Sequence, residues 1–189
     1  LIRTPLVGQQ PPVLINNWEA TEADFDEEKL VDIARSAAPL GIDMFVMDDG
    51  WFGKRDDDNS GLGDWAVNEK KLPGGLQMLV SRIKELGMSF GIWIEPEMVN
   101  EDSDLFRAHP DWALGLPGKP QTRSRNQLTL DFSREEVRDY IYGAIKKVLD
   151  SADISYVKWD MNRSLTDVYS VALPAGRQGE VFHRYTLGV

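Results

Sequence analysis

The sequence predicts an α/β fold in which strands and helices alternate along a chain of 189 residues. Short apolar runs recur, and several are followed by a segment whose apolar residues have helical spacing. Polar residues gather where each apolar run ends. Strands that alternate with helices form a parallel sheet through right-handed crossovers, so this polar set is expected at the carboxyl edge of such a sheet.

Five apolar runs are expected to form strands, and we number them in chain order. Each is short and is separated from the next by a polar or helical stretch. Their ranges are 12–19, 43–50, 89–97, 126–132 and 156–163.

Two helices are expected between the first three strands. The first lies in 26–41 and ends at Gly41, and its apolar side is formed by Leu30, Ile33, Ala34, Ala37 and Leu40. The second ends at Gly87, and its apolar side is formed by Leu76, Leu79, Val80, Ile83 and Leu86.

Two further helices are expected after the third strand. A short one covers 103–109 and stops at the sequence HPDW, because the residue before a proline disfavours helical backbone. A longer one covers 133–151, with Ser133 as N-cap and Glu136 as its capping-box partner.

A barrel explains the polar strand ends better than an open nucleotide-binding sheet does. The stretch NNWEATEADFD after the first strand holds no glycine, whereas a phosphate-binding loop there would be rich in glycine. Five strands cannot close an eight-stranded barrel, which usually takes about 250 residues. We therefore predict a (β/α)8 TIM barrel that is truncated to about its first five βα units, with residues 1–189 as one partial catalytic domain.

Composition limits the possible partners. A net charge of −10 disfavours nucleic acid as a partner, and the absence of cysteine excludes disulfides and thiolate chemistry. Neither a signal pattern nor an apolar run of about 18 residues occurs, so we expect no membrane partner and a cytoplasmic location. No cofactor is indicated.

The sequence KWDMNR places three polar side chains on one face of the last strand. Lys158, Asp160 and Asn162 alternate with apolar residues, although burying such groups is costly. One interpretation is a structural ion pair that fills a barrel layer. The functional interpretation is a nucleophile, because the ammonium of Lys158 favours the ionised form of Asp160.

Asp48 and Asp49, at the end of the second strand, also allow two interpretations. The sequence DDG commonly caps a turn. Adjacent carboxylates can instead accept hydrogen bonds from neighbouring hydroxyls of a sugar, and Trp18 and Trp93 at other strand ends could lie against its apolar face. A single tryptophan is more often a core residue.

The loop 55–64 imitates the first half of a calcium-binding loop. Val67 stands at the twelfth position, however, where such a loop needs a bidentate glutamate, and no helix pair flanks it. We therefore expect no metal site, and interpret the loop as a solvated segment over the mouth of the site.

Several motifs together resemble one enzyme family. NNWEAT, DDGWF, GIWIEPEMV, HPDW, RNQLTLDFS and KWDMNR occur in this order from about Pro12 to the C-terminus. They are similar to the catalytic barrel of the glycoside hydrolase family 36 α-galactosidases, the melibiase group. The resemblance implies a retaining α-galactosidase that hydrolyses melibiose- and raffinose-type oligosaccharides by double displacement, and a homotetramer for the full-length protein.

The resemblance also implies roles for individual residues. Asp160 would be the nucleophile. The substrate-binding residues would be Trp18, Asp48, Asp49, Trp93, Arg125, Lys158 and Asn162.

The chain departs from the family pattern in three respects. Glu22 and Ala23 stand where the family usually has aromatic residues. The family's general acid/base is an aspartate in a segment that would follow Val189, and we expect the flanking β-sandwich domains to be absent from residues 1–189. The sequence alone leaves open an inactive galactoside-binding fragment, or a transferase of the raffinose-synthase kind.

Overall fold

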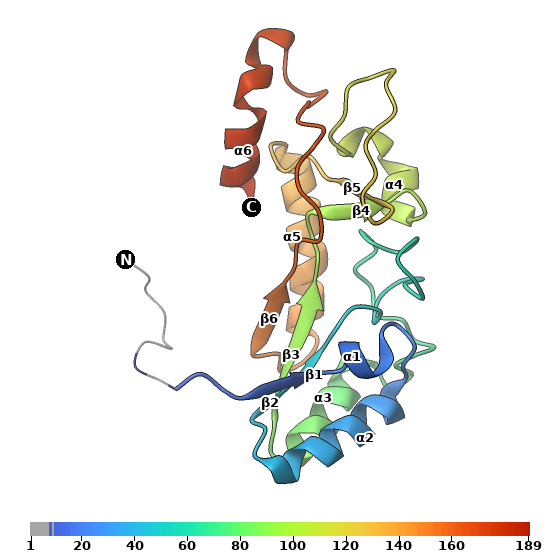
Figure 1. The fold of residues 1–189 in the computed structure, drawn as a ribbon, viewed down its shortest axis with the longest axis vertical. Coiled ribbons are helices and arrows are strands. Elements are labelled where there is room, and N and C mark those ends of the chain that lie inside the picture. The colour runs from blue at the N-terminus through green and yellow to red at the C-terminus, as the bar shows by residue number, and fades with distance from the viewer. Residues whose placement is uncertain (1–7, 9) are drawn as a thin grey trace.

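The main sheet has four parallel strands (Figure 1). A computed structural model describes Gly8 and residues 10–189. The strands lie in the order β1 (Leu14–Asn16), β2 (Met44–Met47), β3 (Ser89–Ile94) and β6 (Tyr156–Trp159). Among the described residues the sheet stays open, with β1 and β6 at its two edges. The prediction of an α/β fold with a parallel sheet is confirmed, but a closed barrel is not seen.

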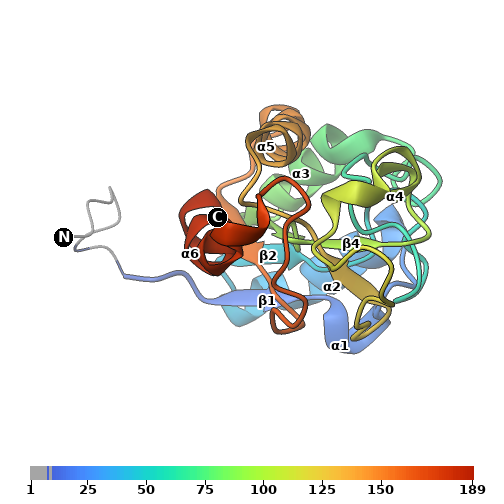
Figure 2. The same cartoon turned by 90° about the horizontal axis from the view of Figure 1, so that it is seen from above.

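Three long helices follow β1, β2 and β5 along the chain and lie on one side of the sheet (Figures 1 and 2). They are α2 (Glu27–Ala37), α3 (Gly75–Glu85) and α5 (Glu135–Asp150). Their apolar residues form one buried cluster with alternate residues of the strands, among them Phe45, Met47, Phe90 and Ile92. Burial of this apolar surface is the main stabilising contribution to the arrangement.

The short elements lie mainly beyond the carboxyl ends of the strands. The α-helices are α1 (Trp18–Thr21), α4 (Asp104–Ala108) and α6 (Val181–Gly188), and the 3-10 helices are η1 (Ala38–Leu40), η2 (Pro110–Trp112) and η3 (Ala175–Glu180). Among all helices of the described residues, none is long and apolar enough to cross a membrane.

The first two predicted helices form, but the first ends earlier than predicted. Asp26 caps α2, which stops at Ala37, and Gly41 instead ends the 3-10 helix η1 that follows. Gly41 and Gly87, the two predicted stops, both adopt left-handed backbone, with φ of 81° and 84°. Leu40 differs from the prediction because it lies beyond α2 in η1, where its side chain is 79% exposed.

The fourth predicted strand was assigned to the wrong sheet. Instead of joining the parallel sheet, β5 (Gln127–Thr129) pairs antiparallel with β4 (Met98–Asn100), and β6 pairs directly with β3. The parallel sheet therefore has four strands where five were predicted. The segment 127–132 is fully buried, so its apolar character did not distinguish the two sheets.

The third predicted strand is also shorter than expected. β3 ends at Ile94, and the chain turns through Pro96 before β4 begins. Proline has no N–H to donate to a ladder, which accounts for the end of the strand here.

The predicted cap of α5 is wrong. The helix begins at Glu135 after Arg134, and Ser133 instead donates its hydroxyl hydrogen bond to Asp131. Glu136 pairs with Arg134, so the reciprocal capping box does not form. The short helix predicted over 103–109 does form, as α4. The Ser103 hydroxyl caps it by accepting from the Phe106 N–H at 3.0 Å.

Candidate active site

A pocket of about 190 Å³ opens at the carboxyl ends of β2, β3 and β6. It is smaller than the roughly 300–1,000 Å³ typical of pockets for drug-sized ligands, so it suits a single small polar ring. Its lining consists of the eight residues singled out from the sequence: Trp18, Asp48, Asp49, Trp93, Arg125, Lys158, Asp160 and Asn162.

Strand register explains why residues far apart in sequence meet here. Trp93 is the partner of Lys158 across β3 and β6. The pairing of Met47 with Ile92 on the neighbouring strands brings Asp48 level with Trp93. Since side chains alternate between the faces of a sheet, these three residues point to the face opposite the helices.

Asp160 follows β6 immediately and is held as a carboxylate. Its Oδ2 accepts hydrogen bonds from Trp93 Nε1 at 2.9 Å and Asn162 Nδ2 at 2.8 Å, and its Oδ1 accepts from Met161 N at 3.1 Å. Burial alone would raise the pKa of Asp160, but these bonds and the charge of Lys158 outweigh burial and lower the pKa below 3.8. The group is therefore ionised at neutral pH, as a nucleophile must be.

Asp48 is buried beside a cation. Its Oδ2 accepts from Lys158 Nζ at 2.8 Å, and its Oδ1 accepts from Asp49 N at 2.9 Å. The buried Asn17 accepts from the Asp48 N–H at 2.9 Å and thereby fixes the backbone of this segment. Lys158 thus pairs with Asp48 across the sheet, in addition to its through-space effect on Asp160.

Asp49 is paired with an arginine that the sequence reasoning missed. Arg55 Nη2 lies 2.7 Å from Asp49 Oδ2, and Arg55 Nε lies 3.0 and 3.1 Å from the two carboxylate oxygens. The Arg55 side chain is only 1% exposed. The sequence did hold one signal for this pairing. Arg55 is a single cation in the acidic run RDDD, seven residues after Asp48.

Trp93 contributes its indole N–H to the site, while its ring belongs to the core. Phe52 stacks on it with ring centroids 6.1 Å apart, and Trp65 packs at 6.4 Å. The Trp51 indole donates to the Trp93 carbonyl at 2.9 Å. The suggested role of Trp93 as an apolar platform for a sugar is therefore less suitable than that of Trp18, which is half-buried at the pocket rim.

The loop 55–64 contributes no residue to the pocket lining, and it is not simply solvated. Residues 61–63 are buried, whereas Asp58 is accessible and lies 3.4 Å from Arg125 Nη2 through its Oδ2. Arg125 and Asn126 both have positive φ, 52° and 57°, at the turn that brings Arg125 to the pocket.

Two other carboxyl groups follow the end of β3, those of Glu95 and Glu97, and neither lines the pocket. Glu95 is fully buried and accepts from Asn162 N at 2.6 Å. Burial raises the pKa of Glu95, and the neighbouring carboxylates of Asp160 and Asp49 raise it further. Asn162 also donates to Asp160, so Glu95 supports the Asp160 carboxylate indirectly. Asp131, near the end of the fourth predicted strand, lies outside the pocket and accepts from Ser133 N.

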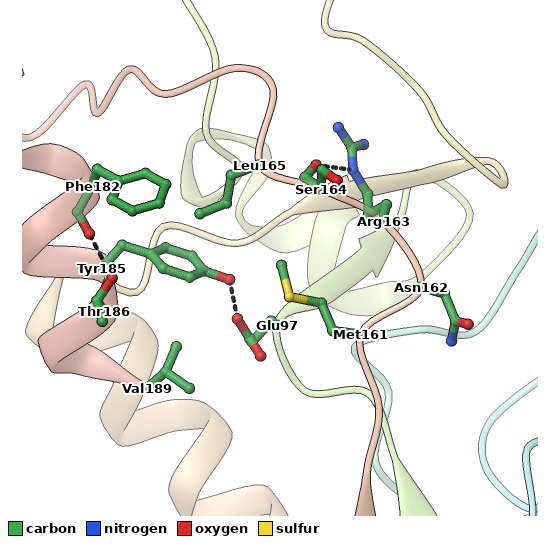
Figure 3. A pocket seen from close by; sticks show the side chains of 10 residues that line it. All are labelled: Glu97, Met161, Asn162, Arg163, Ser164, Leu165, Phe182, Tyr185, Thr186 and Val189. Atoms are coloured by element: carbon green, nitrogen blue, oxygen red, sulfur yellow. Dashed lines mark hydrogen bonds between the residues drawn. The ribbon is translucent and has the colours of Figure 1, made fainter.

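Glu97 lies in a separate groove beside α6 (Figure 3). There it accepts hydrogen bonds from the Tyr185 hydroxyl and from Trp159 Nε1. Met161 points into this groove, whereas the Asn162 side chain points away from it.

Comparison with known proteins shows close similarity to α-galactosidases. The melibiase family model matches residues 1–189. Alpha-galactosidase AgaA of Geobacillus stearothermophilus is 58% identical over 189 residues, which is 100% of this chain and 26% of that protein. The bifunctional alpha-galactosidase/sucrose kinase AgaSK of Mediterraneibacter gnavus is 61% identical over 187 residues, which is 99% of this chain and 19% of that protein.

Solved structures show the same relationship. The crystal structure of the GH36 α-galactosidase AgaA matches with a TM-score of 0.96 at 58% identity, over 98% of this chain and 26% of that one. A variant of AgaA in complex with raffinose matches with a TM-score of 0.96 at 57% identity, over the same shares of the two chains. The chain thus spans about a quarter, or less, of the relatives' length. The family model covers residues 1–189, and AgaA is similar to the chain over the same length. The chain therefore belongs to the melibiase family.

Proposed function

We propose that these residues supply the nucleophile and the galactose-binding groups of a retaining α-galactosidase. The observation that carries the proposal is the ionised Asp160, which Trp93 and Asn162 hold within a small polar pocket. Two donors occupy Oδ2, whereas Oδ1 accepts only from Met161 N and keeps one acceptor position for attack.

In the first step, Asp160 attacks the anomeric carbon and the bond from that carbon to the leaving oxygen breaks. The leaving oxygen takes a proton from a general acid, which the family resemblance places after Val189. In the second step water attacks the galactosyl ester, the same acid residue now accepts a proton, and Asp160 is released as a carboxylate. Two inversions give net retention, and the two carboxyl groups lie about 5–5.5 Å apart in such enzymes.

The remaining pocket residues bind the sugar. Asp48 and Asp49 accept hydrogen bonds from galactose hydroxyls, while Lys158, Arg125 and Asn162 donate to ring substituents. Trp18 lies against the apolar face of the sugar. Hydrogen bonds to charged groups contribute about 1.5–3 kcal/mol each, which is enough to orient one ring.

We propose α-galactosides of the raffinose and melibiose type as substrates. The support is that AgaA variants have been solved in complex with raffinose and with stachyose. A pocket of about 190 Å³ accommodates the terminal galactose, and the rest of the oligosaccharide then extends out of it.

We further propose that residues 1–189 form part of a (β/α)8 catalytic barrel, contributing four of its strands. Three features support this assignment. The four strands lie in the sheet in the order in which they occur along the chain, the long helices lie on one side of the sheet, and polar side chains gather at the carboxyl ends of the strands. A homotetramer of the complete protein stays a prediction from the family resemblance.

The decisive experiment follows the anomer released by the complete reading frame that contains these residues. Proton NMR of early hydrolysis is expected to show α-galactose first, and Asp160→Asn is expected to abolish turnover. Asp153→Asn is the matched control. Asp153 is exposed, pairs with Lys84 and precedes β6, whereas Asp160 follows the other end of that strand. If β-galactose appears first, the reaction is inverting and the role proposed for Asp160 is wrong.

A further inference from the structure

We infer that Arg55 is a positioning residue for galactoside binding, acting through Asp49. This inference rests on the proposed function. Arg55 does not line the pocket, yet its guanidinium lies directly behind Asp49 and is 1% exposed. Buried charges require a partner, and this arginine has one of the most specific kinds, a forked contact with a carboxylate.

The contact determines which part of Asp49 is left for a ligand. Asp49 Oδ2 accepts from both Nε and Nη2 of Arg55, whereas Oδ1 accepts from Nε alone. Each carboxylate oxygen has about two acceptor positions, so Oδ1 keeps one for a hydroxyl while Oδ2 has none. Arg55 therefore presents Asp49 to the sugar through a single oxygen in a fixed direction.

Arg55 is itself fixed by the loop that follows it. Its Nη1 donates to the Ser60 carbonyl at 3.1 Å and to Asn100 Oδ1 at 3.3 Å. Gly61, with φ of 89°, packs so closely that an added Cβ would lie 3.1 Å from Arg55 N. Lys71 donates to the Arg55 carbonyl at 2.9 Å. The guanidinium thus cannot turn away from Asp49 without breaking several contacts.

Arg55 also balances the charge around the pocket. The pocket lining holds three carboxylates and two cations, and Arg55 brings the cations to three; the groups are Asp48, Asp49, Asp160, Lys158, Arg125 and Arg55. A balanced site suits a neutral sugar. Without Arg55, Asp49 would be a buried carboxylate with no cation, which is strongly unfavourable.

The same loop connects Arg55 to Arg125, which lines the pocket. Asp58 lies between two arginines, with Oδ1 3.4 Å from Arg55 Nη2 and Oδ2 3.4 Å from Arg125 Nη2. Asp58 is 45% exposed, so each of these pairs is weak. The loop therefore orients Asp49 strongly and Arg125 only loosely.

The test compares Arg55→Met with Lys54→Met in the complete reading frame. Both changes remove one cation, and the two positions are neighbours in the sequence. Lys54, however, is exposed and does not line the pocket. We expect Arg55→Met to lower kcat/KM for an aryl α-galactoside about tenfold or more, mainly through KM, and Lys54→Met to leave it unchanged.

A double-mutant cycle separates positioning from a general effect on folding. If Arg55 acts through Asp49, Arg55→Met lowers kcat/KM much less in an Asp49→Asn background than in the wild type. An equal factor in both backgrounds would overturn the inference, because it would mean that Arg55 does not work through this carboxylate.

Further variants cover the case in which Arg55→Met does not fold. Arg55→Lys keeps the charge but loses the fork, and we expect a raised KM with an unchanged melting temperature; wild-type kinetics in this variant would contradict the proposal. A wild-type protein that neither binds galactose nor cleaves α-galactosides would overturn the proposed function itself. An active wild type, together with an Arg55→Met variant that behaves like Lys54→Met, would overturn the positioning role alone.

Discussion

Trp93 illustrates how one residue joins the core to the reacting group. Its ring is buried against Phe52 and Trp65, and its indole N–H donates to Asp160 at 2.9 Å. Packing therefore fixes a donor that favours the ionised form of Asp160, the proposed nucleophile.

Trp93→Phe is expected to shift the acid limb of the pH profile. Loss of the N–H removes one of the bonds that lower the pKa of Asp160, so this pKa rises and activity is lost at a higher pH as the solution is acidified. The measurement is kcat/KM against pH. Trp159→Phe is the matched control, since the Trp159 indole donates to Glu97 and not to Asp160.

If the two phenylalanine variants have the same acid limb, the Trp93 hydrogen bond does not control Asp160. The direction of the shift in the pKa of Asp160 also has a consequence for stability. Since the pKa of Asp160 is lowered in the folded protein, its contribution to stability is present above the unfolded pKa. It is lost as the pH falls through the folded value.

Alanine substitution of Asp48 or Asp49 is expected to weaken galactoside hydrolysis. Each proposed bond from a sugar hydroxyl involves a charged acceptor, so kcat/KM should fall roughly tenfold or more in either variant. Steady-state kinetics with an aryl α-galactoside provides the measurement. Unchanged values in both variants would return the pair to the alternative interpretation of a turn cap.

At the scale of the elements, β3 determines how closely its neighbours approach. Gly91 lies in the middle of β3, where an added Cβ would be 2.9 Å from Tyr156 Cδ1 on β6 and 3.1 Å from Val46 Cγ2 on β2. A glycine in a central strand marks such a close approach.

Gly91→Ala is therefore expected to destabilise the sheet by about 1–3 kcal/mol, the usual cost of overpacking. Differential scanning fluorimetry of the complete protein should show a lower melting temperature. Lys158 on β6 should also shift relative to Trp93, which would lower activity. A melting temperature equal to or above that of the wild type would show that Tyr156 moves aside without cost.

Gly143→Ala is the matched control in a helix. Gly143 lies inside α5, and an added Cβ there would meet nothing within 4 Å. Alanine is favoured over glycine in a helix interior by about 0.5–1 kcal/mol, so this variant should be slightly more stable. Replacing glycine by alanine is thus expected to lower the stability in β3 and to raise it in α5.

At the scale of the whole molecule, the sheet formed by the described residues is open, and its edge near β6 carries exposed apolar side chains. Those with large exposed fractions are Tyr156 (39%), Trp159 (46%), Met161 (41%) and Phe182 (58%). Surfaces of this kind, next to an unpaired strand edge, favour association.

Residues 1–189 expressed alone are accordingly expected to self-associate and to leave melibiose uncleaved. The carboxylates in the pocket lining are Asp48 and Asp49, which are paired with cations, and Asp160, so none is placed to protonate a leaving oxygen. General acid catalysis contributes about 10²- to 10⁴-fold. Light scattering and melibiose turnover, compared with the complete reading frame, provide the measurements.

An aryl galactoside with a good leaving group should be affected less, because it needs little protonation to leave. Monodisperse 1–189 that cleaves melibiose as fast as the complete protein would contradict this prediction. Glu95 would then need re-examination, although it is fully buried behind Asn162.

The sequence by itself determined the α/β alternation, the helices α2 and α3 with their glycine stops, and seven of the eight residues that line the pocket; the eighth, Arg125, came only from the family resemblance. These features are local, since helical period, glycine stops and the polar face of KWDMNR each depend on neighbouring residues. The membership of Asp48 and Asp160 in one pocket also followed, because the carboxyl ends of parallel strands share one edge of a sheet.

Only the tertiary structure decided which sheet contains 127–129 and which cation faces Asp49. The buried run at β5 fits either sheet, and its partner β4 depends on the turn after β3. Arg55 lies in a loop with no periodicity, and its burial depends on Ser60, Gly61 and Asn100 closing around it. Contacts of this kind are long-range pairings of polar groups, and no period in the sequence records them.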